Sequence, residues 1–103
     1  MPLSPKSITT TAVDVWQGSN DLDSLTFRNA GSAGIIYVKN MQTDQAEVSA
    51  TDYGIILRAG EGASVTRKND GEGISYANWR AISDTGGGVS LAILAIYKGR
   101  RRR

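Results

Sequence analysis

The stretch Val89-Ser90-Leu91-Ala92-Ile93-Leu94-Ala95-Ile96-Tyr97 decides the fold, because its composition suits either a short helix or a strand. Three glycines at 86–88 precede it and offer no N-cap, and nine residues make only a short helix. A strand would have two apolar faces here, one with the odd-numbered residues and one with Ala92, Leu94 and Ile96. We therefore predict a strand covered on both faces, with another subunit as one candidate cover.

The rest of the chain repeats this pattern of short apolar segments between glycine-rich turns. The segments are rich in Thr, Val, Ile and aromatic residues, or alternate apolar with polar residues, as strands do. They lie at 7–15, 25–28, 35–38, 46–49, 55–57, 64–66 and 74–82. Clusters of Gly with Asn, Asp or Glu at 29–34, 60–62, 69–73 and 84–88 indicate turns. About eight short strands at this spacing predict an all-β protein, a single-domain β-sandwich or jelly roll, or a small barrel.

The length of 103 residues supports one hydrophobic core. We expect residues 1–6 to form a flexible N-terminal arm, residues 7–98 the β-sandwich domain, and residues 99–103 a basic tail. No apolar run reaches the roughly 18 residues of a membrane span, and the first residues lack the apolar core of a signal peptide. A soluble protein that is not exported by the usual route, and that makes no membrane contact, is therefore expected.

The charge is divided between the body of the chain and its C-terminal tail. The formal net charge is +2, but Arg100, Arg101, Arg102 and Arg103 supply four of the twelve basic residues. Without them, eight basic residues face ten acidic ones, so the body has a charge of −2. The tail is then either a solubilising end or an electrostatic contact with an acidic groove or packaged nucleic acid.

The residue types exclude most catalytic and metal sites. The chain has no His and no Cys, which removes the imidazole base, the thiol nucleophile and the usual zinc ligands. The acidic segments at 20–23 and 69–72 do not continue into a calcium-binding loop, and the glycines at 60–62 and 86–88 lack the Lys of a phosphate loop. We predict no catalytic residue, no cofactor and no metal, and therefore a protein that is not an enzyme.

Three regions are candidates for contact with a partner. The Thr-rich run with Ile8 and Thr10 can pair within its own sheet or with a neighbouring subunit. Trp16 precedes Gln17-Gly18-Ser19-Asn20, which suggests an exposed loop. The four tail arginines form the third region. A nucleic-acid binder would also interleave aromatic residues with a basic groove, and only Trp79-Arg80 does so here, so this partner is not favoured.

Five segments, taken in order, carry a family resemblance: ITTTAV (8–13), LTFRNAG (25–31), YVKN (37–40), GIILRAGE (54–61) and WRAISDTG (79–86). Their order resembles small virion structural proteins of tailed bacteriophages. There, a strand ending in Asn-x-Gly precedes a leucine followed by Gly-Glu, then an aromatic-x-Ala-x-Ser segment and a last strand. The resemblance covers most of the chain. It implies a jelly-roll-like sandwich without active-site residues, present as a homo-oligomer or in many copies.

The expected function is that of a capsid decoration, or cement, protein that bridges and stabilises viral coat subunits. The resemblance also fits a neck, tail or fibre component, and it places the protein in the virion, assembled in the host cytoplasm. Coat protein or another virion protein is the implied partner. A receptor- or carbohydrate-binding β-sandwich module is the alternative from a different class, because aromatic loops suit sugar stacking.

Overall fold

The computed structural model describes residues 6–17, 22–41, 46–66, 78–86 and 88–97. In these ranges the regular elements are all strands, which confirms the all-β prediction, and no helix is present that could span a membrane. The eight strands are β1 (Lys6–Ile8), β2 (Val13–Trp16), β3 (Leu22–Asn29), β4 (Ile36–Asn40), β5 (Ile55–Leu57), β6 (Gly62–Thr66), β7 (Trp79–Ser83) and β8 (Val89–Tyr97).

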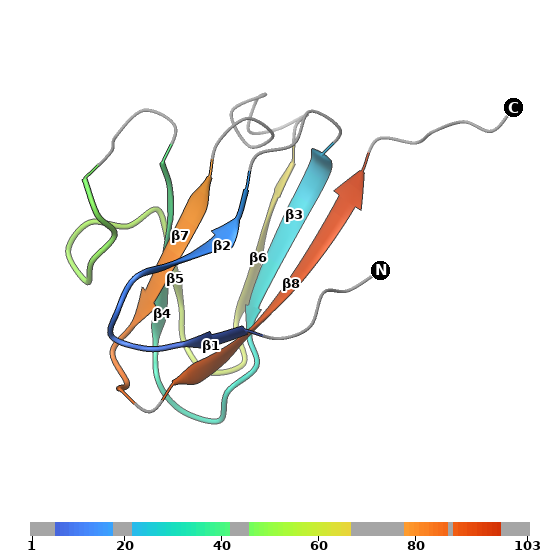
Figure 1. The fold of residues 1–103 in the computed structure, drawn as a ribbon. Coiled ribbons are helices and arrows are strands. Elements are labelled where there is room, and N and C mark those ends of the chain that lie inside the picture. Colours follow the sequence, from blue (N-terminus) through green and yellow to red (C-terminus); the bar gives the residue numbers. More distant parts are fainter. Residues whose placement is uncertain (1–5, 18–21, 42–45, 67–77, 87, 98–103) are drawn as a thin grey trace, which may run out of the picture.

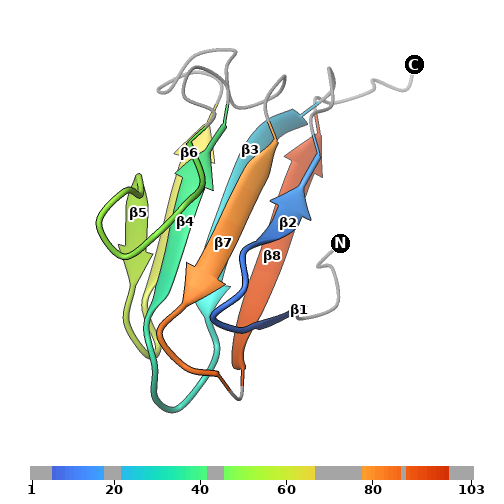
Figure 2. The ribbon, with the colours of Figure 1, turned by 60° about the vertical axis from the view of Figure 1, so that its left-hand side comes forward.

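The strands form two four-stranded antiparallel sheets (Figures 1 and 2). Sheet A has the order β1-β8-β3-β6, and sheet B has the order β2-β7-β4-β5. The pairings between strands are nested. β4 pairs with β5, β3 with β6, β2 with β7, and β1 with β8. The chain is therefore paired like one long hairpin, with its closed end at β4 and β5.

The core lies between the two sheets. In β8, Val89, Leu91, Ile93 and Ala95 are all buried, so the strand predicted at 89–97 is confirmed together with its inner face. The opposite side of the core comes from sheet B, and the rings of Phe27 in β3 and Trp79 in β7 lie 5.4 Å apart. Alternation of apolar and polar residues along each strand thus places one apolar face of each sheet against the other.

The strand predicted at 7–15 is wrong as a single element. Lys6, expected at the end of the arm, begins β1, and the chain then leaves sheet A and enters sheet B at Val13. Ser83, at the end of β7, holds this crossing. Its backbone N–H donates to Thr9 O at 2.8 Å, and its hydroxyl donates to Ile8 O at 2.7 Å. In a continuous strand, the carbonyl groups of Ile8 and Thr9 would accept hydrogen bonds from a neighbouring strand. Here they accept them from Ser83.

The strand predicted at 46–49 is also wrong. Residues 46–54 form a loop whose backbone ladder is limited to one isolated bridge between Ser49 and Asp52. The alternation of Ala46 and Val48 with polar residues does bury Val48, which is 1% exposed, but Val48 lies outside the main core cluster. Residues 74–77 of the strand predicted at 74–82, the turn predicted at 69–73, and the boundary predicted at 98 and 99 lie outside the described residues.

Asn29, the last residue of β3, is fully buried and binds the turn that follows it. Its side-chain amide donates to Gly34 O and to Leu57 O, both at 3.0 Å, and its side-chain oxygen accepts from Gly31 N at 2.9 Å. One side chain therefore joins the turn after β3 to the end of β5.

Candidate binding surfaces

The residues predicted to contact a partner fall into different environments. Ile8 ends β1 and is fully buried, and Trp16 ends β2 with 9% of its surface exposed, so both side chains pack in the core of the chain itself. Thr10 lies exposed in the crossing between the sheets. Arg100, Arg101, Arg102 and Arg103 lie outside the described residues. Of the three predicted contact residues that the structure describes, Thr10 is exposed and the other two are buried.

The loop predicted after Trp16 covers residues 17–20, of which 18–20 lie outside the described residues, and Trp16 itself is buried because β2 contains a bulge. The pairing of β2 with β7 shifts register between Asp14 and Trp16, so Val15 is the extra residue. A bulge of this kind turns two consecutive side chains to nearly the same face. Val15 and Trp16 are both buried as a result. The polar residues after Trp16 gave no sign of this, because a bulge depends on the partner strand.

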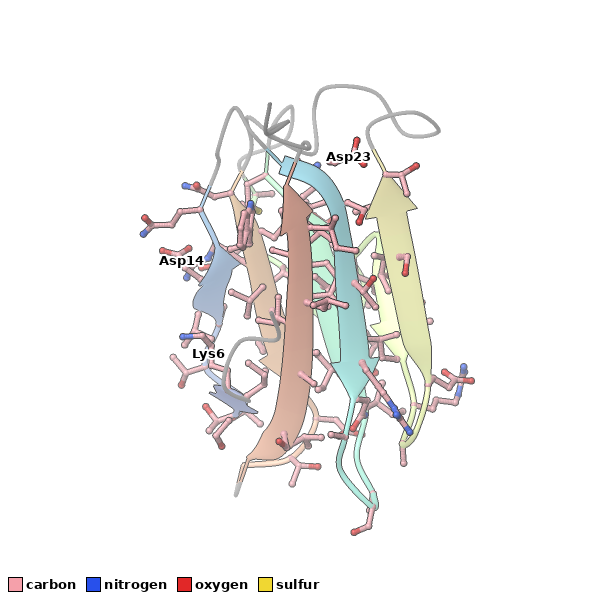
Figure 3. All side chains as sticks on the ribbon, turned by 90° about the vertical axis from the view of Figure 1, so that its right-hand side faces the viewer. Lys6, Asp14 and Asp23 are labelled. Atoms are coloured by element: carbon pink, nitrogen blue, oxygen red, sulfur yellow. The ribbon has the colours of Figure 1, made fainter. Side chains whose placement is uncertain are left out.

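A cleft of about 300 Å³ opens beside these residues and is lined by Lys6, Asp14, Val15, Trp16 and Gln17. We call it the edge cleft, because β1 and β2 are the edge strands of their sheets on this side of the molecule. Lys6 and Asp14 mark its position in Figure 3. Each of the two strands is paired with one neighbour, and no second strand of the described part of the chain lies along its other edge. The edge cleft combines opposite charges, an apolar wall and open strand edges.

The outer face of sheet B is covered by the loop 46–54. Arg80 holds the loop through Glu47, with Nε to Oε1 at 2.8 Å and Nη2 to Oε2 at 3.1 Å, and it also binds Asp14 at 2.6 Å. The ammonium group of Lys39, which is buried, bonds to Ala46 O at 2.7 Å and to Asp52 at 2.9 Å. Two cations of sheet B therefore anchor the loop to the sheet.

Ion pairing sets the electrostatics of this face. The hydrogen bond from Arg80 lowers the pKa of Glu47 below its usual value of 4.5. The bonds to Glu47 and to Asp14 raise the pKa of Arg80 in turn. The Glu47 carboxylate accepts hydrogen bonds from a guanidinium and so stays ionised, which suits a structural contact rather than proton transfer. No group of three or more potential metal ligands gathers within the described part of the chain.

The outer face of sheet A is open. The strand registers place on it Ser90, Ala92, Leu94 and Ile96 of β8, Ser24, Thr26 and Arg28 of β3, and Gly62, Ser64 and Thr66 of β6. Ile96 is 49% exposed, and the hydroxyls of Thr26 and Ser64 are 2.7 Å apart. Figure 3 looks onto this face, and no described segment crosses in front of it. Both faces of β8 were predicted to be covered, and no described segment covers its outer face. Coverage of that face by another subunit stays a prediction.

Comparisons with protein-family models, with curated proteins and with solved structures found no match. The edge cleft and the two outer faces are therefore interpreted from their own geometry.

Proposed function

We propose that this chain is a non-enzymatic virion structural protein, a jelly-roll capsid decoration protein of a tailed bacteriophage that bridges and stabilises coat subunits. The nested strand pairing carries the proposal. A long hairpin of eight strands, wrapped so that its successive pairs of strands alternate between two sheets, produces the observed orders β1-β8-β3-β6 and β2-β7-β4-β5. We interpret this arrangement as a jelly roll, a fold used by viral capsid proteins and by sugar-binding proteins.

The segments that carry the family resemblance support a scaffold role. Asn29 joins two turns, and Ser83 holds the crossing between the sheets. Glu61 accepts a hydrogen bond from Arg58 N at 2.8 Å, which closes the turn before β6. Each of these polar residues is used to build the fold, so the resemblance is one of architecture. Because a fold hosts many functions, the proposal also needs a surface that fits a coat subunit.

The edge cleft is the surface that we propose for the coat protein. An extended segment of a coat subunit can add to the open edge of β1 or β2 as a further strand, where backbone hydrogen bonds supply affinity. Lys6 then provides a positive charge that orients the segment, opposite Asp14, which is also bonded to Arg80, and the small exposed parts of Val15 and Trp16 line the cleft. A copy that binds neighbouring coat subunits buries surface against each of them and raises the free energy needed to separate them.

The copy number per particle tests this proposal. Quantitative mass spectrometry of purified phage should find the chain at on the order of hundreds of copies, because decoration follows the many symmetry-related positions of a shell. A count of about six to twelve would instead match a ring in the neck or tail. That count, or the absence of the chain from the particle, would reject decoration.

A pair of charge-reversal variants tests the edge cleft itself. Lys6→Glu should weaken binding to particles stripped of the protein by about tenfold or more, because it turns the cleft acidic on both sides. Arg58→Glu makes the same change of charge after β5, outside the edge cleft, and should bind as the unchanged protein does. Equal binding by both variants would contradict a coat contact at the edge cleft.

A carbohydrate-binding module is the second candidate, and one observation favours it. The rings of Tyr37 and Tyr53 lie 5.1 Å apart beside the outer face of sheet B, and Tyr53 is 41% exposed. Exposed aromatic rings are the usual platform for a sugar. Binding of a glycan that is lost in Tyr53→Ala and unaffected by removal of the tail arginines would favour this candidate over decoration.

A further inference from the structure

We propose that the outer face of sheet A binds the same face of a second copy of this chain across a two-fold axis. This inference does not depend on the virion role, because it concerns the purified chain alone. It starts from the face that no described segment covers, whose centre is formed by Thr26 of β3 and Leu94 of β8.

Two exposed charged residues lie at opposite ends of β3, Arg28 on this face and Asp23 at the register shift beside Ser24. Arg28 is exposed near the end of the strand, and Asp23 is exposed near its beginning, where the register with β8 shifts between Leu22 and Ser24. Figure 3 shows Asp23 at the upper end of β3. Five residues of strand separate the two side chains by about 17 Å. Neither side chain has an ion-pair partner among the residues that the structure describes. The face therefore has one unpaired positive end, one unpaired negative end and an uncharged centre.

A two-fold axis that lies in the interface and runs perpendicular to β3 makes this face complementary to itself. Such an axis reverses the direction of the partner's strands, so each Arg28 lies at the Asp23 end of β3 of the other copy. With the axis at Thr26 and Leu94, the large side chain of Ile96 faces the small side chain of Ala92, and Leu94 meets its own equivalent. Arg28 then lies opposite Ser24, next to Asp23. An axis parallel to β3 would place like charges opposite each other. The charges thus select the antiparallel arrangement.

The size of the face sets the strength of the association. Seven residues along a strand span about 24 Å, and four strands span about 19 Å, so the flat area is about 450 Å² per copy. The pair would bury about 900 Å², which belongs to the class of weak and transient interfaces. We therefore expect a dimer that forms at high protein concentration, as on a surface crowded with copies, and dissociates on dilution.

Sedimentation equilibrium of the full chain at low salt tests the proposal. The dimer fraction should rise between about 10 µM and about 2 mM, and added salt should reduce it because two ion pairs close the interface. Arg28→Glu should weaken association about tenfold or more, because it places two acids opposite each other. Asp23→Arg should have the same effect by placing two cations opposite each other. A chain that stays monomeric through the whole range would overturn the proposal.

The double variant Asp23→Arg/Arg28→Glu is the decisive measurement. It restores both ion pairs with their signs exchanged, so its dissociation constant should return to within about threefold of the unchanged chain. A double variant that associates no better than the single ones would rule out the antiparallel pairing. Circular dichroism of each variant confirms folding, since both positions are exposed.

Two further controls separate this interface from the edge cleft. Arg58→Glu changes the charge equally outside the outer face of sheet A and should leave self-association unchanged. Lys6→Glu should lower binding to stripped particles and leave self-association unchanged as well. If the unchanged chain forms the dimer but does not bind stripped particles, the decoration role alone is contradicted. If the unchanged chain binds particles but stays monomeric, the two-fold interface alone is contradicted.

Discussion

Asn29 shows how a single polar residue can join distant parts of a small β protein. The sequence predicted a turn at 29–34 from its Asn and Gly content, and the turn is present. The burial of the Asn29 side chain could not be predicted, because one of its acceptors, Leu57 O, lies 28 residues away. Local composition indicates where a chain turns, whereas the partner of a buried amide depends on how the turns come together.

Asn29→Ala should lower the free energy of unfolding by about 2 to 4 kcal/mol, because it leaves buried backbone groups without partners and opens a small cavity. Asn29→Asp keeps the shape but cannot donate to the two carbonyl groups, so it should destabilise at least as much. Ser32→Ala, an exposed change in the same turn, should stay within about 0.5 kcal/mol. Urea denaturation measures all three. A loss below about 1 kcal/mol in both Asn29 variants would show that Asn29 does not hold the turns together.

The pairing of Glu47 with Arg80 predicts a loss of stability in acid. Because the folded state holds the pKa of Glu47 below its usual value of 4.5, this contribution is present above that pH and is lost as the pH falls through the lowered pKa. Glu47 is 55% exposed, so the contribution should be about 1 kcal/mol or less. Glu47→Gln should therefore be less stable at pH 7 and should lose less stability between about pH 5 and pH 3.

Urea midpoints at the two ends of this pH range test the Glu47 prediction. Asp84 also has a lowered pKa, because its carboxylate accepts a hydrogen bond from Ile35 N, so some acid sensitivity remains in the variant. Identical pH profiles for Glu47→Gln and the unchanged chain would contradict the prediction.

At the scale of the element, the sequence predicted the strands that lie in the core better than the segments that cross between layers. The segments at 55–57 and 89–97 match β5 and β8 at both ends. The break after β1, the bulge at Val15 and the loop 46–54 were missed. Each of these involves a residue from elsewhere in the chain, namely a hydrogen bond from Ser83, strand pairing with Trp79 and an ion pair with Arg80. The alternation of apolar and polar residues along one segment does not indicate which distant residues will contact it.

Three Gly→Ala variants separate the effects of backbone conformation and of space in the turns. Gly34 has a φ of 96°, and an added Cβ would lie 2.6 Å from Val89 Cγ2, so Gly34→Ala should cost about 3 kcal/mol or more. Gly60 has a φ of 82° with open space around it, so Gly60→Ala should cost about 1 to 2 kcal/mol. Gly86 has neither constraint, and Gly86→Ala should be neutral within about 0.5 kcal/mol.

Thermal and urea unfolding of the three glycine variants should reproduce this order. An equal loss in Gly34→Ala and Gly60→Ala would show that the contact with Val89 has no effect. A large loss in Gly86→Ala would mean that the turn at 84–88 is held differently.

At the scale of the whole molecule, the sequence predicted an all-β chain with about eight strands, and it could not predict which strands pair. Lys6 pairs with Leu91 across nearly the whole chain, and no local pattern at either residue indicates the other. The candidate surfaces follow from the same pairings. The edge cleft lies where β1 and β2 are both edge strands. β8 lies between β1 and β3, so its outward-facing side chains are part of the outer face of sheet A. The sequence indicated Trp16, which lines the edge cleft, and β8, which contributes to the outer face of sheet A, but not the shape of either surface.

The nested pairing also determines when the fold can be completed during synthesis of the chain. β1 is made first and its partner β8 is made last, so a chain on the ribosome has all of sheet B before it has the strand between β1 and β3. Pairing between strands so far apart in the sequence is slow, and β1 cannot pair with β8 until β8 has been synthesised. A copy that stops before residue 89 lacks β8, which supplies Leu94 and Ile96 to the outer face of sheet A. Translation of β8 is therefore required for the proposed two-fold interface, and copies that end before β8 cannot form that interface.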